Sequence, residues 1–371
     1  MKVVVAGAGI GGLALAHALH AHGIEVEIHE RAARLQPAGA GITVQANAMR
    51  ALQTIGLDAR VLAAGNAVTE ADIVAPGGAV LSRLPVAALG APMVAIHRGV
   101  LQQVLVEGLE SRVHTGSAVR AAREAPDGVV LELEGGGEAC ADLVVGADGL
   151  HSVLRGHVLG DAPPRYAGYT SWRGVCAADV PHARTTEAWG AGERFGVVPI
   201  GGGRVYWFAV ADAPAGIRRA PDEEKRDLLA RFGSWHVPCR ALIEATPPQA
   251  ILRTDIFDRP PVRRWSRGRV TLLGDAAHPM TPNLGQGGCQ AIEDAVVLAR
   301  ALGRHGDVAR ALAEYEALRL PRANRFVTDS WRMGRVAQWR NPVARMARTA
   351  LLRATPEASL ARRLRRTLAF A

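Results

Sequence analysis

Two glycine-rich segments, one near each end of the chain, limit the possible folds more than any other feature. The first, Gly7-Ala8-Gly9-Ile10-Gly11-Gly12, follows the apolar run 3–5 and precedes residues 13–22, whose apolar positions have helical spacing. The second, 274–295, joins the apolar run 270–273 to an acidic turn and a glycine-rich helix start. A helix N-terminus after a glycine turn attracts anionic groups, because its unpaired backbone N–H groups point at the ligand. Two such sites in one chain are expected to clamp one ligand.

The first segment is typical of a strand–helix–strand unit that binds the pyrophosphate of a dinucleotide. Gly7 permits the tight turn, Gly9 lets the backbone approach the phosphates, and Gly12 allows the helix to pack closely on the strand. Glu30 ends the second strand, where a carboxylate accepts hydrogen bonds from a ribose diol, and Arg31 follows it. The alternative for Glu30 is a solvated acid at a strand end.

The second segment distinguishes a flavin from a nicotinamide ligand. A nicotinamide dehydrogenase would account for the first segment equally well, but not for a second strand, acidic turn and helix. Asp275 is placed to accept hydrogen bonds from ribityl hydroxyls, or else it caps the turn. The helix expected over 290–301 would stabilise negative charge on a reduced flavin ring, which would face the backbone amides of Leu284, Gly285, Gln286 and Gly287. The sequence therefore predicts FAD.

The predicted fold class is α/β. A Rossmann-like, three-layer FAD-binding domain is expected, with an interleaved mixed β-sheet substrate domain and C-terminal helices. Short alternating strands over 71–97 and a β-rich, aromatic stretch over 166–257 indicate the second domain. The expected boundaries are 1–70, 98–165 and 263–330 for the FAD-binding domain, 71–97 and 166–262 for the substrate domain, and 331–371 for basic helices.

Charge is concentrated at the C-terminus. Residues 331–371 hold ten arginines, no lysine and one acid, Glu357, and so carry the whole net charge of +9. This pattern predicts two amphipathic helices with solvated basic faces, in preference to a nucleic-acid or anionic-membrane site. No apolar run is long enough to span a membrane, the first strand begins at Lys2, and the four cysteines lack metal-site spacing. We therefore expect a cytoplasmic protein with no integral membrane association, no nucleic-acid partner and no metal.

Three motifs together resemble a known enzyme family. They are Gly7-x-Gly9-x-x-Gly12, Asp148-Gly149 followed by His151-Ser152 and Arg155, and Gly274-Asp275 through Glu293-Asp294. The combination, over residues 2–325, is similar to the single-component FAD monooxygenases of the para-hydroxybenzoate hydroxylase family. Segments 165–169, 255–258 and 282–289 most resemble urate hydroxylases and zeaxanthin epoxidases.

The resemblance implies roles for further residues. It adds Arg98, beneath the pyrophosphate, and Asp148 to the FAD-binding set, although Asp148 could simply cap a turn. Pro282 and Gly285 would lie at the reacting face of the flavin. Arg204 would face the substrate cavity, where it could pair with an anionic substrate; an exposed arginine is the alternative. Substrate contacts are also predicted for Tyr206 and Trp172, with sheet core as their alternative.

The implied function is an FAD-dependent monooxygenase using NADH or NADPH and O2. It would hydroxylate or epoxidise a small aromatic or heteroaromatic substrate through a flavin C4a-hydroperoxide. Two alternatives are an FAD-dependent reductase of prenyl-type double bonds and a flavin-binding protein without monooxygenase turnover. A monomer or homodimer is expected.

Overall fold

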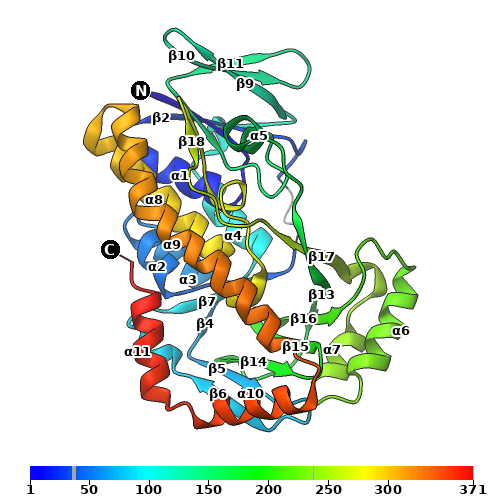
Figure 1. Ribbon diagram of the computed structural model, residues 1–371. Coiled ribbons are helices and arrows are strands. Elements are labelled where there is room, and N and C mark those ends of the chain that lie inside the picture. The colour runs from blue at the N-terminus through cyan, green and yellow to red at the C-terminus, as the bar shows by residue number, and fades with distance from the viewer. Residues whose placement is uncertain (36–38, 237, 371) are drawn as a thin grey trace.

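Two large sheets organise the molecule (Figure 1). The computed structural model describes residues 1–35, 39–236 and 238–370. One sheet lies near the N-terminus and the other in the opposite half, and the long helix α9 (Val308–Ala337) runs from one half to the other (Figure 1). None of the described helices is long and apolar enough to cross a membrane.

The first sheet has six strands, and its central members are parallel. β1 pairs in parallel with β2 and β12, and β12 pairs in parallel with β19. Val3, Val4 and Val5 of β1 are fully buried, as expected for a central parallel strand covered on both faces. Ligands bind where such strands end. The order is β18 (Ser266–Arg267), β19 (Val270–Leu272), β12 (Leu143–Gly146), β1 (Lys2–Ala6), β2 (Glu25–Glu30) and β8 (Val113–Thr115).

The second sheet has seven strands and is mostly antiparallel. Side chains of successive strand residues point to opposite faces, so each face has its own environment. One face, called here the outer face, packs on α6 (Pro221–Phe232) and α7 (Cys239–Ala245). The other, the inner face, contacts the loop that follows β19. The order is β17 (Leu252–Asp258), β13 (Arg165–Ala177), β16 (Arg204–Asp212), β15 (Glu193–Gly201), β14 (Arg184–Trp189), β5 (Glu70–Val74) and β6 (Val80–Leu84).

Two three-stranded sheets complete the β structure. One is β3 (Gly41–Val44), β7 (Met93–His97) and β4 (Asn66–Val68), and the other is β11 (Glu138–Ala141), β10 (Gly128–Leu133) and β9 (Val119–Ala125). Of the strands expected over 71–97, β5 and β6 therefore join the seven-stranded sheet, whereas β7 pairs with β3 and β4.

The helices connect and cover these sheets, so the α/β class is confirmed. The helix expected over 290–301 is longer, because the glycine-rich segment is itself helical and the helix ends only at Gly306, which has φ 64°. The remaining helices are α1 (Ile10–Ala21), α2 (Ala46–Gln53), α3 (Asp58–Ala64), α4 (Arg98–Val106), α5 (Val153–Leu159), α8 (Gly287–His305), α10 (Pro342–Ala354) and α11 (Glu357–Thr367), with short turns η1 (Val86–Leu89), η2 (Glu110–Arg112), η3 (Pro248–Ala250), η4 (Gly274–Ala276) and η5 (Pro282–Leu284).

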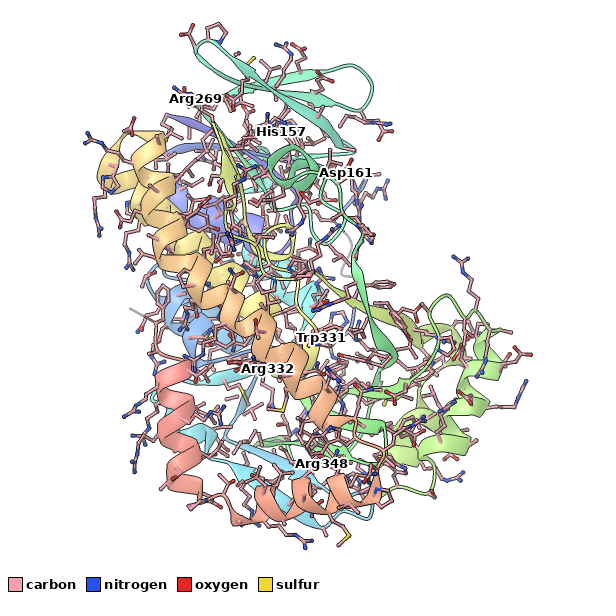
Figure 2. The ribbon with its side chains drawn as sticks, viewed as in Figure 1. His157, Asp161, Arg269, Trp331, Arg332 and Arg348 are labelled. Atoms are coloured by element: carbon pink, nitrogen blue, oxygen red, sulfur yellow. The ribbon has the colours of Figure 1, made fainter. Side chains whose placement is uncertain are left out.

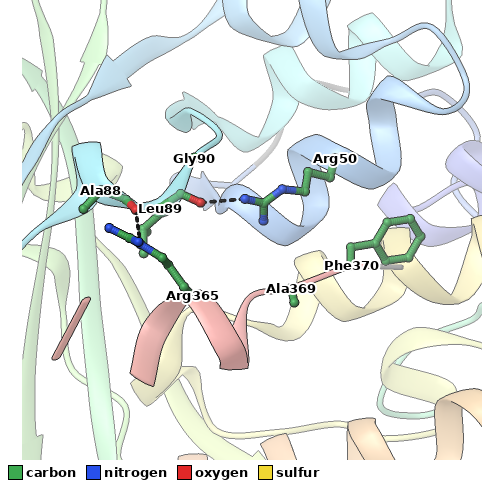
Figure 3. Close-up of a pocket in the computed structure, with 7 residues that line it drawn as sticks. All are labelled: Arg50, Ala88, Leu89, Gly90, Arg365, Ala369 and Phe370. Carbon is green, nitrogen blue, oxygen red and sulfur yellow. Dashed lines mark hydrogen bonds between the residues drawn. The ribbon is translucent and has the colours of Figure 1, made fainter. Parts of the chain in front are cut away.

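Helix α11 packs against the body of the protein through its apolar side. Leu364 and Leu368 join a core cluster that includes Leu89 of η1. Arg365 donates to the carbonyl of Ala88 at 2.6 Å, beside an open pocket of about 360 Å³ (Figure 3). The four arginines of α11 are exposed, which confirms the solvated basic face expected there.

Helix α10 differs from the expectation. Its exposed side is apolar, whereas Arg348 is buried between α10 and the rest of the protein (Figure 2). The expectation of a solvated basic face is wrong here, because Arg348 donates to the carbonyls of Val336 and Ala337 at the end of α9.

Candidate active site

The first glycine turn has the geometry of a phosphate-binding turn. Gly7 has φ 106°, and a Cβ there would lie 2.5 Å from the carbonyl oxygen of Ala147. A Cβ at Gly12 would collide with the carbonyl oxygen of Gly7, so both glycines are required by the packing itself. A Cβ at Gly9 would meet nothing within 4 Å. The space above the start of α1 is therefore open to a ligand.

Charged groups surround this turn. The carboxylate of Glu30 accepts hydrogen bonds from the backbone N–H groups of Ala8 and Ala32, both at 2.9 Å. Glu30 is thus fixed beside the glycine turn and is not freely solvated. Arg31 follows it and is exposed, and the exposed Arg98 begins α4. These positions fit the adenosine and pyrophosphate parts of FAD.

Asp275 stands at the second turn with its side chain exposed, although much of the protein surrounds it. The surrounding protein raises the pKa of Asp275, and the nearby His278 and Arg98 oppose this shift without cancelling it. A Cβ at Gly287 would lie 3.7 Å from Oδ1 of Asp275, which places the acid beside the first turn of α8. The buried Arg155 donates to the carbonyls of the next two residues, Ala276 at 2.7 Å and Ala277 at 2.8 Å. Asp275 is thus an accessible acid beside the start of α8.

The two helix starts lie side by side, as expected for sites that share one ligand. A Cβ at Gly11 of α1 would lie 3.1 Å from Cβ of Ala291 in α8. A Cβ at Gly288 of α8 would lie 3.6 Å from Cδ1 of Ile10 in α1. The open space at Gly9 and the accessible carboxylate of Asp275 therefore border neighbouring helix ends. The residues present fit FAD.

The loop before α8 is held by amide side chains that the sequence did not single out. Gln45 donates to the carbonyls of Leu284 at 2.8 Å and Gly285 at 3.3 Å. Gln286 is buried, and its side chain donates to Gln45 at 2.8 Å and accepts from Asn47 at 2.9 Å. The side chain of Gln286 thus supports the loop and leaves only its backbone to face a flavin.

Pro282 and Gly285 are the exposed residues of the same loop. Gly285 has φ 63°, a left-handed conformation that favours glycine. The loop is therefore rigidly shaped while its surface stays open.

A buried ionic cluster anchors α8 to α9. Nε2 of His278 lies 2.5 Å from Asp294, and Arg319 donates to the same carboxylate at 2.7 Å. Arg319 also pairs with Glu293, which in turn accepts from Arg322 at 2.7 Å. Burial would raise the pKa of Asp294, but His278 and Arg319 outweigh it and hold the pKa at about 2. These contacts place His278 in the scaffold.

Asp148 caps a turn. Its Oδ2 accepts a hydrogen bond from the backbone N–H of Val153 at 2.8 Å, at the start of α5. Burial raises the pKa of Asp148, and its Oδ1 is buried without a hydrogen-bond partner in the described part of the chain. Asp148 therefore caps the turn with one carboxyl oxygen, and its other oxygen has no hydrogen-bond partner in the described part of the chain.

The inner face of the seven-stranded sheet carries two of the predicted substrate residues. Arg204, Tyr206 and Phe208 alternate along β16 on this face. Tyr206 packs against Gly41, and burial raises the pKa of its phenol to about 12. Its ring lies 5.9 Å from that of Phe208. Arg204 is exposed at the start of the strand.

Trp172 does not belong to this surface, so its prediction as a substrate contact is wrong. It is 2% exposed and lies on the outer face, where its indole donates to Glu224 of α6 at 2.6 Å. The hydrophobic pattern of β13 gives two faces but does not show which one α6 covers. The sheet-core alternative holds for Trp172.

Another group of contacts, which the sequence does not reveal, joins the seven-stranded sheet to the loop before α8. The buried Arg194 of β15 donates to Glu187 at 3.0 Å and to Asn283 at 2.7 Å. Asn283 donates to the hydroxyl of Tyr169 at 3.0 Å. Asn283 lies within the second glycine-rich segment, but nothing in the local sequence indicates Arg194 as its partner.

These features define a class of protein. Two adjacent helix starts, with Glu30 beside one and the accessible Asp275 beside the other, fit FAD, and a sheet with an aromatic inner face contacts the loop before α8. This arrangement is that of a flavin-binding protein.

Comparison with known proteins identifies the family. Residues 1–330 match the family model described as FAD binding domain. The aurachin C monooxygenase/isomerase of Stigmatella aurantiaca is 50% identical over 377 residues, covering 100% of this chain and 98% of that protein. The FAD-dependent urate hydroxylase of Klebsiella pneumoniae is 38% identical and covers 88% of each chain. The structure of Klebsiella pneumoniae HpxO with FAD and uric acid has a TM-score of 0.93 and 33% identity, over 99% of this chain and 96% of that one.

The chain belongs to the single-component FAD-dependent monooxygenases of the para-hydroxybenzoate hydroxylase family. It is an FAD-dependent enzyme of the class that takes NAD(P)H as co-substrate and hydroxylates or epoxidises aromatic substrates. The reductase and non-enzymatic alternatives are not favoured.

Proposed function

We propose that the enzyme uses O2 and NADH or NADPH to oxygenate a fused nitrogen heterocycle of the 2-alkyl-4-quinolone type. The FAD, when bound, supplies the means to activate O2 and transfer one oxygen atom. The protein's own part is to hold the cofactor, orient the ring beneath the loop 282–287 and exclude water from the reacting atoms.

The proposed substrate class rests on the aromatic inner face of the seven-stranded sheet. Tyr206 and Phe208 are half-buried, and their rings, tilted by 37° to each other, form a largely apolar aromatic surface, which suits an aromatic ring system with a hydrocarbon substituent. The relatives support this choice. Besides the aurachin C enzyme, the 2-heptyl-3-hydroxy-4(1H)-quinolone synthase of Pseudomonas aeruginosa is 35% identical over 97% of this chain and 95% of its own length.

Polar groups on the same face would orient the ring oxygen. The Tyr206 phenol is protonated at neutral pH, as any tyrosine is, and can donate a hydrogen bond; burial raises its pKa further, to about 12. Arg204 would offset the cost of burying an oxyanion or enolate, to which a guanidinium donates well. For a neutral hydrocarbon substrate Arg204 would contribute little.

The proposed FAD contacts follow the positions of the two glycine turns. Gly7, Gly9, Gly12 and Arg98 would hold the pyrophosphate, Glu30 and Arg31 the adenosine half, and Asp275 the ribityl chain. The surface of Pro282, Leu284 and Gly285 would face the flavin ring. Asp148 and the backbone of Gln286 and Gly287 complete the proposed set.

The substrate proposal is tested with the FAD-loaded enzyme and a panel of 2-alkyl-4-quinolones, urate, hydroxybenzoates and polyenes. We expect quinolones to stimulate NAD(P)H oxidation most, and labelled dioxygen to place one labelled atom in the product. Stimulation by urate or hydroxybenzoate alone would contradict the quinolone class. A product labelled from water would contradict the use of O2.

Arg204 is tested separately with Arg204→Met and a matched control, Arg226→Met, on the exposed side of α6. We expect Arg204→Met to lower kcat/KM by roughly tenfold or more for a substrate ionised at the ring oxygen, the loss expected from one charge-assisted hydrogen bond. A neutral substrate should be little affected, and Arg226→Met should change neither. Equal losses on both substrates would remove the proposed role of Arg204.

A further inference from the structure

Helix α10 presents apolar side chains to solvent and keeps an arginine inside. Val343, Met346 and Leu351 are 74%, 72% and 69% exposed, whereas Arg348 is 4% exposed. A surface helix of a globular protein normally has the opposite arrangement, with its apolar stripe toward the core. The exposed arc of α10 also includes Pro342, Ala347, Ala350, Arg353 and Ala354, of which only Arg353 is charged.

Buried contacts fix α10 in this orientation. Arg348 donates through Nη1 to the carbonyls of Val336 at 3.3 Å and Ala337 at 2.5 Å, and through Nη2 to that of Gly190 at 3.2 Å. Its guanidinium lies 5.3 Å from the ring of Trp189. Rotating the helix to bury Met346 would break these hydrogen bonds, so the outward apolar face is built into the fold. Figure 2 labels Arg348 at this junction.

The surroundings of the apolar face are aromatic and basic. Trp339, in the connection between α9 and α10, is 38% exposed. Arg340, Arg345 and Arg353 flank the exposed arc, and the segment 331–371 carries ten arginines against one acid. Of the flanking three, Arg340 lies 3.5 Å from Asp212.

The charge around the apolar face of α10 indicates what binds there. A second copy of the chain would bring the same positive charge, which opposes association through this surface. A nucleic acid would match the charge but not the exposed Val343, Met346 and Leu351. A bilayer surface with anionic headgroups matches both, since apolar side chains enter the acyl boundary while arginines remain at the headgroups.

We propose that α10 is an in-plane membrane anchor that docks the enzyme on anionic lipid bilayers. The helix, Pro342–Ala354, lies along the surface, with Val343, Met346 and Leu351 inserted and Trp339 at the interface. The association is peripheral, in keeping with the lack of a membrane-crossing helix among the described residues.

The experiment is cosedimentation of the FAD-loaded enzyme with vesicles of phosphatidylcholine alone or with one third phosphatidylglycerol. We expect binding to the mixed vesicles, weaker binding in high salt, and little binding to phosphatidylcholine alone. Met346→Glu should lower the partition coefficient by roughly tenfold or more, because it removes inserted apolar area and adds a negative charge. Leu318→Glu, a matched change at a residue 56% exposed on α9, should bind like the wild type.

Three results would overturn the proposal. If the wild-type enzyme stays in the supernatant when anionic vesicles are sedimented, α10 does not bind membranes. Equal binding by Met346→Glu and the wild type would show that α10 is not the site. If the wild type does not bind vesicles but forms a dimer in sedimentation velocity, and Met346→Glu abolishes that dimer, the apolar face belongs to an interface with a second copy of the chain. Activity on a water-soluble substrate serves as the folding control, because Met346 lies outside the proposed catalytic and cofactor sites.

Discussion

Replacing Asp275 by alanine is expected to separate cofactor binding from folding. In the described part of the chain no protein group donates a hydrogen bond to the Asp275 side chain, and the side chain is exposed. Its loss therefore removes no contact that holds the fold. If the carboxylate accepts a ribityl hydroxyl, its removal costs about 1.5–3 kcal/mol, the usual value for a hydrogen bond to a charged group. That loss corresponds to a roughly 10- to 150-fold increase in the Kd for FAD.

The assay is titration of apoprotein with FAD, followed by the quenching of flavin fluorescence, together with the Tm of each apoprotein. Asp275→Asn, which keeps an acceptor but loses the charge, should fall between the wild type and Asp275→Ala. Asp329→Ala is the control and should match the wild type, because Asp329 on α9 has a side chain that is 40% exposed and pairs with arginines of its own helix. A folded Asp275→Ala apoprotein with a Kd within threefold of the wild type would refute the reasoning.

Four further outcomes are expected. Trp172→Phe should lower the free energy of unfolding by about 1–3 kcal/mol, because it leaves the buried Glu224 without its indole donor, and it should leave KM unchanged. Tyr206→Phe should instead raise KM and leave Tm unchanged. The Asp294 pKa of about 2 lies below its ordinary value, so its contribution of roughly 2 kcal/mol is present above about pH 4 and is lost as pH falls through 2. The free energy of unfolding in urea should fall between pH 5 and 2.5, and it should fall less steeply in Asp294→Asn; a residual slope is expected because the pKa of Glu293 is lowered as well. Deleting the chain from Glu357 onward should lower Tm, since α11 covers a core cluster, yet leave flavin reduction intact; loss of FAD from this truncation would contradict a purely structural role for α11.

The sequence alone predicted the parts of the molecule that depend on local backbone geometry. The turn at Gly7 could be recognised because its φ of 106° favours glycine, and Gly12 because a side chain there would collide with the carbonyl of Gly7 in the same strand–helix unit. The acid beside the turn, Glu30, follows from a fixed offset within that unit. The second segment, with Asp275 and Gly285, is equally local. Composition also showed that the positive charge lies in residues 331–371, because arginines can be counted in the sequence.

Which face each strand and helix presents depends on tertiary packing. Trp172 and Tyr206 occur in similar aromatic strands, but α6 and α7 cover the face that holds Trp172. Gln45 meets Leu284 across 239 residues of chain, and no local pattern encodes such a contact. The buried Arg348 turned the apolar side of α10 outward, against the hydrophobic preference of an isolated surface helix, because the carbonyls at the end of α9 need donors. Alternation and periodicity define faces, and the packing of distant segments determines what each face contacts.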